Sequence, residues 1–302
     1  IEVKTKVFRL VFNSKGGILE TLELLDFKKN YEEKSPIYKL IDRLKNNATG
    51  CFAVLGLEES FSNATFEINT SKMESNHIII VQSVKSGIKV EKVFTIHENE
   101  YDFDFKIIVT NLRSSDIKNN LKVVGVSDME FDFHDTNSLM NDQIATMIDE
   151  GGDFISAGDI HMFSKTYGAR QGLSTLKEET FIMGPLRKTK NERHDKATVV
   201  WGGLKNRYFT VIQKPKKVNW SVNGLDLNPE SLKDRKMENT VPQLVWVASE
   251  SNLAAGESFQ DSFLVYAGPL KTSIINSPRL EETRFVEMID YGFMFPRFIK
   301  VF

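Results

Sequence analysis

The sequence lacks the features that disulfide-bonded and membrane-spanning chains need. It has a single cysteine, Cys51, in 302 residues, so it forms no intrachain disulfide and offers no thiolate pair to a metal. No stretch approaches the roughly 20 consecutive apolar residues of a membrane helix, and no signal sequence is recognisable. Because the first residue is Ile1 rather than Met, we expect the chain to be a piece of a longer protein. We expect Cys51 to be a small apolar core residue.

An excess of one charge is also missing. Lys and Arg total 39 and Asp and Glu total 41, which gives a formal net charge of -2 and a sequence pI near 6.3. Nucleic-acid-binding domains usually have a pI above about 9, so we expect no nucleic-acid partner. The basic residues between Arg187 and Lys196 are interrupted by Glu192 and Asp195, which favours a solvated loop over a patch that binds phosphate groups.

Common catalytic motifs are absent as well. The sequence has no P-loop, no dinucleotide-binding glycine motif, no nucleophile elbow and no H-E-x-x-H motif, so we expect no catalytic residue, cofactor or metal. The best local candidates for chemistry are Asp132 with His134 and Asp159 with His161. On a strand each pair would share a face, where it could supply metal ligands or an acid and a base. Nothing in the sequence brings the pairs together, which favours ordinary polar loop residues.

Strand patterns dominate what is present. Residues 89–96 alternate apolar and polar side chains, with Lys92 on the apolar face, and residues 101–109 alternate in the same way. The short polar segment between these two runs predicts a hairpin, because both arms keep a period of two. Residues 3–12 and 18–25 predict two more strands, separated by a turn at Gly16-Gly17.

The rest of the chain continues in this style. The apolar run at residues 78–81 predicts a strand buried on both faces. Further strands are expected at residues 121–126, 129–133, 197–201, 207–213, 218–222, 243–248 and 259–267. Helical spacing is confined to residues 139–148 and 270–289, and residues 223–239 predict a long loop. The inventory predicts one large all-β, antiparallel sandwich with few helices.

The C-terminal tail after Tyr291-Gly292 is rich in phenylalanine. As a helix, residues 293–302 would be about 15 Å long, too short to span a bilayer. Two interpretations are open: an amphipathic helix in the membrane interface, or a terminal helix that docks on the sandwich. The candidate membrane-interface residues are Phe293, Phe295, Arg297, Phe298, Lys300 and Phe302.

Four stretches of the chain carry a resemblance to a known family. They are residues 3–17 with Gly16-Gly17; residues 92–111; Trp201 followed by Tyr208-Phe209 and Pro215; and residues 256–269 followed by Asp290-Tyr291-Gly292. In order and spacing they resemble the large extracytoplasmic domain of the YidC membrane-protein insertases, which are related to the Oxa and Alb insertases. The chain departs from the family at Gln213, where a tryptophan is expected, and at Phe293 and Phe295, which replace tryptophans.

The resemblance implies a fold and a place in the cell. The fold would be a β-supersandwich similar to that of galactose mutarotase, formed by residues 1–290 with short C-terminal helices. Residues 291–302 would begin an amphipathic interfacial helix leading to the membrane part. The domain would lie on the periplasmic side of the cell inner membrane, preceded by a membrane helix. The insertase groove would lie beyond Phe302, so none of its residues is expected here.

The resemblance also implies a function. The domain would be a non-catalytic part of an insertase that assists the insertion and folding of inner-membrane proteins. Its partners would be subunits of the Sec translocon, nascent membrane proteins and, through the tail, the membrane surface. The alternatives are a carbohydrate-binding or aldose-epimerase-like domain, suggested by the fold alone, and a simple spacer or scaffold.

Overall fold

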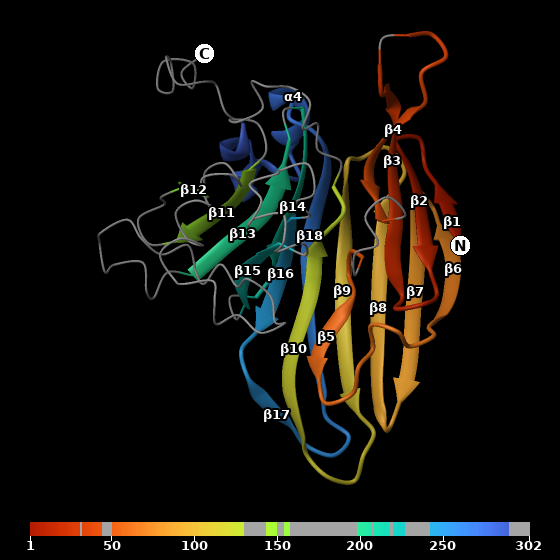
Figure 1. The fold of residues 1–302 in the computed structure, drawn as a ribbon, viewed down its shortest axis with the longest axis vertical. Helices are drawn as coiled ribbons and strands as arrows, with labels where there is room; N and C mark the ends of the chain where they lie inside the picture. The colour runs from red at the N-terminus through yellow and green to blue at the C-terminus, as the bar shows by residue number, and fades with distance from the viewer. Residues whose placement is uncertain are drawn as a thin grey trace, which may run out of the picture.

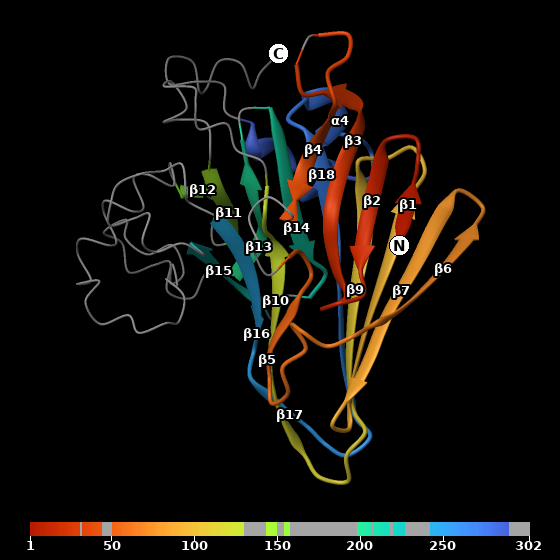
Figure 2. The same cartoon turned by 45° about the vertical axis from the view of Figure 1, so that its right-hand side comes forward.

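The computed structural model describes residues 1–30, 32–43, 50–129, 143–149, 154–157, 198–206, 208–217, 220–226 and 242–289. These residues form three antiparallel sheets (Figure 1). A four-stranded and a five-stranded sheet lie over one face of a nine-stranded sheet (Figure 2). Isolated bridges from Leu19 to Cys51 and from Ile41 to Met129 connect the two smaller sheets into one layer. The predicted all-β, antiparallel sandwich is confirmed.

The strands of the smaller sheets come from both halves of the chain. The four-stranded sheet has the order β1 (Glu2–Lys4), β2 (Phe8–Asn13), β3 (Ile18–Lys28) and β4 (Ile37–Asp42). The five-stranded sheet has the order β15 (Trp220–Asp226), β16 (Pro242–Ala248), β10 (Ile117–Val126) and β17 (Ser251–Leu253), and β5 (Val54–Leu57) also pairs with β10.

The nine-stranded sheet brings the chain's two halves together at its centre, where β18 pairs with β9. Its order is β12 (Phe154–Ala157), β11 (Gln143–Asp149), β13 (Thr198–Lys205), β14 (Phe209–Pro215), β18 (Ser258–Pro269), β9 (Asp102–Asn111), β8 (Ile88–His97), β7 (Asn76–Lys85) and β6 (Glu67–Met73). The helices among the described residues are short and C-terminal, as predicted: α4 (Thr272–Ile275), η6 (Glu281–Thr283) and η7 (Phe285–Met288).

Four local predictions are wrong. The strand expected at residues 3–12 is two strands, β1 and β2, and the helix expected at residues 139–148 is replaced from Gln143 by β11. β11 pairs with β12 on one side and β13 on the other, and this pairing overrides a weak local helix signal. Residues 223–226, expected to begin a long loop, belong to β15 instead, and residues 227–239 of that prediction lie outside the described residues.

The fourth wrong prediction concerns the apolar run in β7. Ile79 and Val81 are fully buried, but Ile78 and Ile80 are only half-buried. The inner face of β7 packs against the smaller sheets, while its outer face meets solvent. Four apolar residues in a row therefore mark a strand with one buried face and one partly apolar exposed face.

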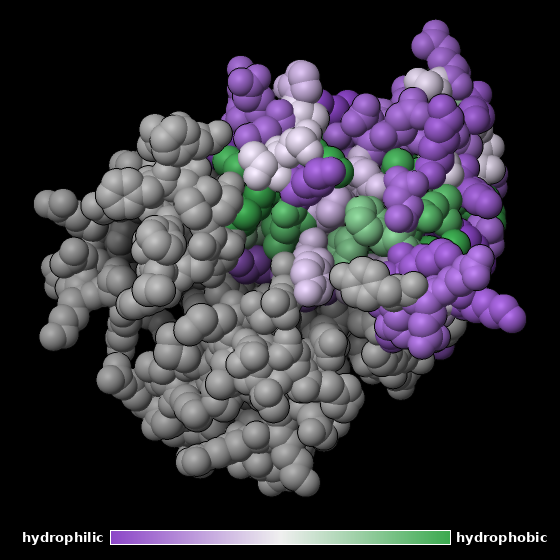
Figure 3. Space-filling model, turned by 90° about the horizontal axis from the view of Figure 1, so that it is seen from above, coloured by the Kyte–Doolittle hydropathy of each residue, from purple (hydrophilic) through white to green (hydrophobic). Residues whose placement is uncertain are grey.

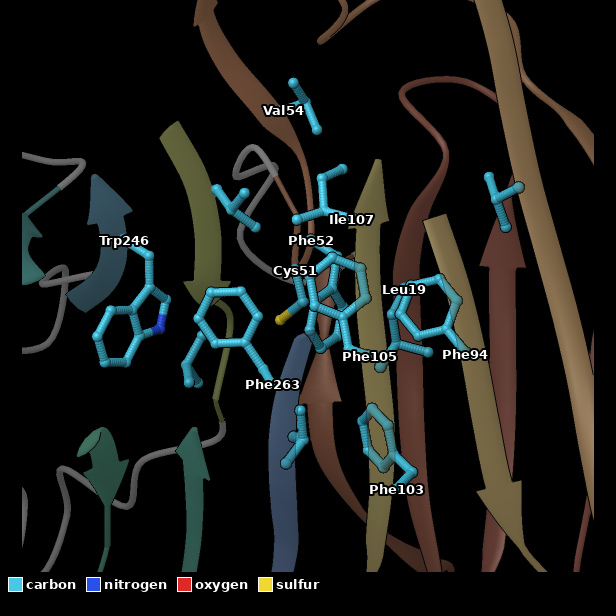
Figure 4. Close-up of a cluster of buried hydrophobic side chains, with 14 of the residues drawn as sticks. Leu19, Cys51, Phe52, Val54, Phe94, Phe103, Phe105, Ile107, Trp246 and Phe263 are labelled. Carbon is cyan, nitrogen blue, oxygen red and sulfur yellow. The ribbon is translucent and has the colours of Figure 1, made fainter. Parts of the chain in front are cut away.

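The core between the two layers is built from phenylalanine (Figure 4). The rings of Phe52 and Phe105 are 4.6 Å apart, those of Phe12 and Phe94 are 4.9 Å apart, and those of Phe94 and Phe105 are 5.1 Å apart. All four side chains are fully buried. Tilted and edge-on contacts of this kind stabilise a core beyond the area that they bury.

Lys92 lies on this apolar face, as the alternation predicts, and it is completely buried. Its ammonium group donates to the carbonyls of Gly16 and Gly17, at 2.9 and 2.7 Å, and lies 4.5 Å from the ring centre of Phe66. A Cβ on Gly17 would approach that ring to 2.6 Å, so the turn reaches the lysine only because it is made of glycine. Burial lowers the pKa of Lys92 to about 7.

This burial makes stability depend on pH. The unfolded chain, with Lys92 at its ordinary pKa of 10.5, binds more protons than the folded chain between about pH 7 and pH 10. The burial cost is therefore fully present below pH 7 and is relieved as pH rises. We expect the free energy of unfolding of the wild type, relative to Lys92→Met, to rise by about 1–3 kcal/mol across this interval in urea titrations. Lys118→Met, at an exposed lysine of β10, is the control and should show no such trend; the same trend in both variants would contradict the prediction.

Candidate functional site

The residues predicted from sequence to contact the membrane lie outside the described residues. This applies to Phe293, Phe295, Arg297, Phe298, Lys300 and Phe302, and also to the two Asp-x-His pairs. Within the described residues, no group of histidine, cysteine and acidic side chains could hold a metal ion, and no helix is long and apolar enough to cross a membrane.

Cys51 is a core residue, as predicted. It is fully buried, and its thiol donates to the carbonyl of Ser127 at 3.3 Å and accepts from the Ser127 amide at 3.2 Å. Burial, together with the nearby charge of Asp128, raises the pKa of the Cys51 thiol well above its ordinary value. The cysteine therefore serves packing between the two smaller sheets.

Chemistry-bearing side chains gather instead at one end of the sandwich, which we call the upper end. It is formed by the β3–β4 loop, the β8–β9 turn, the β13–β14 turn and the C-terminal helices, at the top of Figure 1. Seen from above, it shows apolar surface bordered by hydrophilic surface (Figure 3). Two of the large apolar side chains exposed on the molecule lie here, Tyr208 at 62% and Ile37 at 41%.

A cluster of aromatic rings supports this end. Tyr38 stacks on Phe209 with ring centres 4.4 Å apart, and Phe27 meets Phe209 edge-on at 5.1 Å. Tyr101 packs near Phe27 and donates its hydroxyl to Asp26 at 2.6 Å. The cluster joins β3 and β4 of the four-stranded sheet to β14 of the nine-stranded sheet, so it closes the upper end of the core.

Asn206 holds the turn that presents Tyr208. Its side-chain carbonyl accepts from the amides of Tyr208 and Phe209, at 3.0 and 2.8 Å, and its side-chain amide donates to the hydroxyl of Tyr38 at 2.9 Å. Asn206 is buried. These bonds fix the backbone at Tyr208 and Phe209, so the exposed ring of Tyr208 projects from a hydrogen-bonded support.

An ion cluster lies beside the aromatic rings, on the outer face of the nine-stranded sheet. Arg279 reaches Asp102 with Nε at 2.5 Å and Asp104 with a terminal nitrogen at 2.6 Å. Lys216 and His97 each lie 3.5 Å from the Asp104 carboxylate. Asp102 is 1% exposed, so Arg279 supplies the charge that a buried carboxylate needs.

The two carboxyl groups differ in their acidity. Burial raises the pKa of Asp102, although Arg279 opposes this. For Asp104, burial is outweighed by His97, Arg279 and Lys216, which hold its pKa well below the ordinary range. Asp104 therefore stays ionised at neutral pH. It pairs with the cationic side chains of Arg279 and Lys216, and it has no proton to supply as a general acid would.

The cluster fastens the C-terminal segment to the sheet. Arg279 lies between α4 and η6, and Ile275, Leu280, Phe285 and Met288 of this segment are buried against Trp201 and other outer-face residues. Lys205 also donates to the carbonyl of Met288 at 3.1 Å. The segment that leads to the predicted membrane part is thus held both by apolar burial and by charge.

The cluster has little signal in the sequence. His97 falls in the short polar segment of the predicted hairpin, and Asp102 and Asp104 fall on the polar face of its second arm. The available signal was the pair of acidic residues two apart, which share a strand face, followed much later by a single arginine among apolar helix residues. Nothing local indicates that the C-terminal segment folds back across β9.

We expect Arg279→Gln to loosen this segment, because Asp102 is left buried without its cation. The free energy of unfolding should fall by about 1–3 kcal/mol, and amide hydrogen exchange should accelerate in residues 270–289 more than in β7 and β8. Lys271→Gln, at an exposed position of the same segment, removes the same charge and is the control. Equal exchange rates in the two variants would show that the ion cluster does not hold the segment.

Solved structures with similar folds come from several bacteria. A galactose mutarotase-like protein from Lactobacillus casei has a TM-score of 0.53 and 10% identity, with 88% of this chain and 99% of that chain covered. The Slr1438 protein from Synechocystis has a TM-score of 0.53 and 8% identity, with 89% and 95% covered. A TPR-domain containing protein from Parabacteroides distasonis has a TM-score of 0.46 and 8% identity, with 88% of this chain but only 46% of that chain covered. At these identities the likeness to the Lactobacillus casei and Synechocystis structures establishes the fold alone.

Sequence comparison gives the family. A search of the curated proteins found no match. The family model described as the YidC periplasmic domain matches residues 1–301, and its match takes in all four stretches that carried the resemblance. The chain belongs to the YidC periplasmic domain family.

Proposed function

We propose that this chain is the non-catalytic extracytoplasmic domain of a YidC-type insertase and assists the insertion and folding of inner-membrane proteins. The observation that carries the proposal is the family match over residues 1–301. The partners are subunits of the Sec translocon and nascent membrane proteins. The family description supports a periplasmic position at the cell inner membrane.

The upper end supports a role in contact rather than in catalysis. Its carboxylate Asp104 pairs with Arg279 and Lys216, and His97 lies 3.5 Å from the same carboxylate. An ionised, multiply paired carboxylate has no proton to give. Tyr208, in contrast, is exposed on a fixed turn, and exposed tyrosine is enriched where proteins bind each other.

We place the upper end toward the membrane. The C-terminal segment is docked there through Arg279, and residues 291–302 follow it directly. In this proposal residues 1–290 form the sandwich and residues 291–302 begin an interfacial helix. Phe293, Phe295, Phe298 and Phe302 enter the acyl boundary, and Arg297 and Lys300 face the headgroups.

Photo-crosslinking in the full-length insertase tests the partner contacts. A photoreactive phenylalanine analogue at Tyr208 should give adducts with translocon subunits or nascent chains. The same analogue at Leu112, which is 53% exposed in the loop between β9 and β10, is the matched control and should give none. Adducts from Leu112 alone would show that the end opposite the upper end faces the partners. No adducts from either position would contradict the contact role.

Flotation with anionic liposomes tests the tail. We expect the chain to float with the vesicles and a truncation after Gly292 to float less, because the truncation removes the aromatic residues and both cations of the tail. Arg297→Gln with Lys300→Gln should lose binding to anionic vesicles more than to neutral ones. Equal flotation of the full chain and the truncated chain would rule out an interfacial tail.

A carbohydrate-binding or aldose-epimerase-like domain is the second candidate. Its support is the mutarotase-like fold together with the His97–Asp104 pair. A thermal-shift screen with aldoses, combined with polarimetry of glucose mutarotation, separates the two functions. We expect neither a shift nor a rate above the uncatalysed one, and a positive result in both assays would favour the second candidate.

A further inference from the structure

The strand β6 forms one border of the nine-stranded sheet. It has seven residues, Glu67–Met73, and pairs with β7 over its whole length without a register shift. Figure 2 shows it at the rim of the sheet, with β7 on one side and no strand on the other. Six of its seven residues are exposed. The outer edge of this strand is therefore open to solvent.

The main-chain groups that face outward can be identified from the hairpin. β6 and β7 are joined by the two-residue turn Glu74-Ser75, so the flanking pair Met73 and Asn76 is hydrogen-bonded. Hydrogen-bonded pairs alternate along an antiparallel ladder. The amides and carbonyls of Ile68, Thr70 and Lys72 therefore point away from β7, and they have no backbone partner among the residues that the structure describes.

The usual protection of a sheet edge is weak here. Three other border strands are protected, because β1 and β12 are very short and β4 carries register shifts. β6 has neither feature and contains no proline. Its one lysine, Lys72, forms an ion pair with Glu98 at 3.1 Å, so its charge is partly neutralised. Long, regular and unblocked edges are templates for another strand.

The side chains along the edge indicate what would fit. On the inner face, Ile68 lies opposite Val81 and packs against the core. On the outer face, Met73 is 62% exposed, and the half-buried Ile78 and Ile80 of β7 lie behind the edge. An added strand with an apolar residue beside Ile68 would extend the core past β6. An extended chain is also the only structure whose main chain matches donors and acceptors at every second residue.

A second copy of this chain fits less well. A two-fold axis through Thr70 would keep both faces of the sheet continuous, but it would set Ile68 opposite Lys72 twice. This places a charge against the residue that extends the core. The edge is therefore matched to a different sequence.

We propose that the outer edge of β6 binds an extended segment of another polypeptide by antiparallel strand addition, with an apolar side chain beside Ile68. The inference deepens the proposed function and rests on it only for the origin of the segment, a client or partner of the insertase. The edge lies far along the sheet from β13 and the C-terminal helices, so this contact is separate from the one tested at Tyr208.

Two substitutions at one residue isolate the edge. The amide of Thr70 points outward, so Thr70→Pro removes a free donor and places a ring in the path of an added strand without breaking a bond to β7. Thr70→Val keeps the amide and the strand propensity, so it is the matched control. Both variants should melt within a few degrees of the wild type.

The probe is a capped, fluorescent peptide of alternating threonine and valine, as long as β6, and binding is followed by anisotropy. We expect the wild type and Thr70→Val to bind it alike and Thr70→Pro to bind it at least about tenfold more weakly. The same peptide N-methylated at consecutive central residues, which cannot pair as a strand, should not bind the wild type. If Thr70→Pro fails to fold, the comparison of the unmodified and N-methylated peptides on the wild type still tests whether the edge binds by strand addition.

Three results would overturn the inference. They are no binding by the wild type, equal binding by Thr70→Pro and Thr70→Val, and binding of the N-methylated peptide. A wild type that is dimeric by light scattering, with a monomeric Thr70→Pro variant, would assign the edge to a second copy instead. The crosslinking result at Tyr208 is independent of all these outcomes, so failure at β6 is distinguishable from failure of the proposed function.

Discussion

The nine-stranded sheet must bury parts of both of its faces, and this requirement organises the molecule. Its inner face is covered by the two smaller sheets through the phenylalanine core (Figure 4). Among the described residues, the C-terminal helices cover its outer face over β13, β14 and β18, and Arg279 reaches β9. An antiparallel sheet with one solvent-exposed face tolerates polar residues there. The outer face over β7 and β8 therefore carries both polar and apolar side chains. The C-terminal segment is therefore part of the fold, and not a linker attached to it.

Two of the stretches that carried the family resemblance meet in space. The Gly16-Gly17 turn and Lys92 are 75 positions apart or more in sequence, yet the lysine donates to both glycine carbonyls. A buried ammonium group is costly unless its donors are satisfied, and this turn satisfies two of them. Gln213, where the resemblance led us to expect tryptophan, is also explained. It accepts from Trp246 at 2.7 Å and donates to the carbonyl of Gly125 at 2.9 Å, which joins the large sheet to β16 and β10.

The upper end of the sandwich holds its surface segments in place, as a surface that binds a partner requires. Asn206 holds a turn through hydrogen bonds, and Arg279 adds a charged contact to a segment that is also held by apolar burial. Rigid presentation lowers the entropy lost when a partner binds. The opposite border of the sheet, β6, is rigid for a different reason, since its ladder to β7 is continuous.

Alternation alone determined much of this protein. The β8–β9 hairpin, the one-sided burial of Lys92 and the all-β class follow from a period of two, because each pleated strand sorts its own side chains. Sequence order did not determine which strands are neighbours. The pairing of β18 with β9 joins residues about 150 positions apart. The pairing of β11 with β12 and β13 makes residues 143–148, a candidate helix from local spacing, part of a strand. The cluster of Arg279 with Asp102 and Asp104 exists only because the chain returns across β9, and such long-range returns are set by the burial of whole faces rather than by any local pattern.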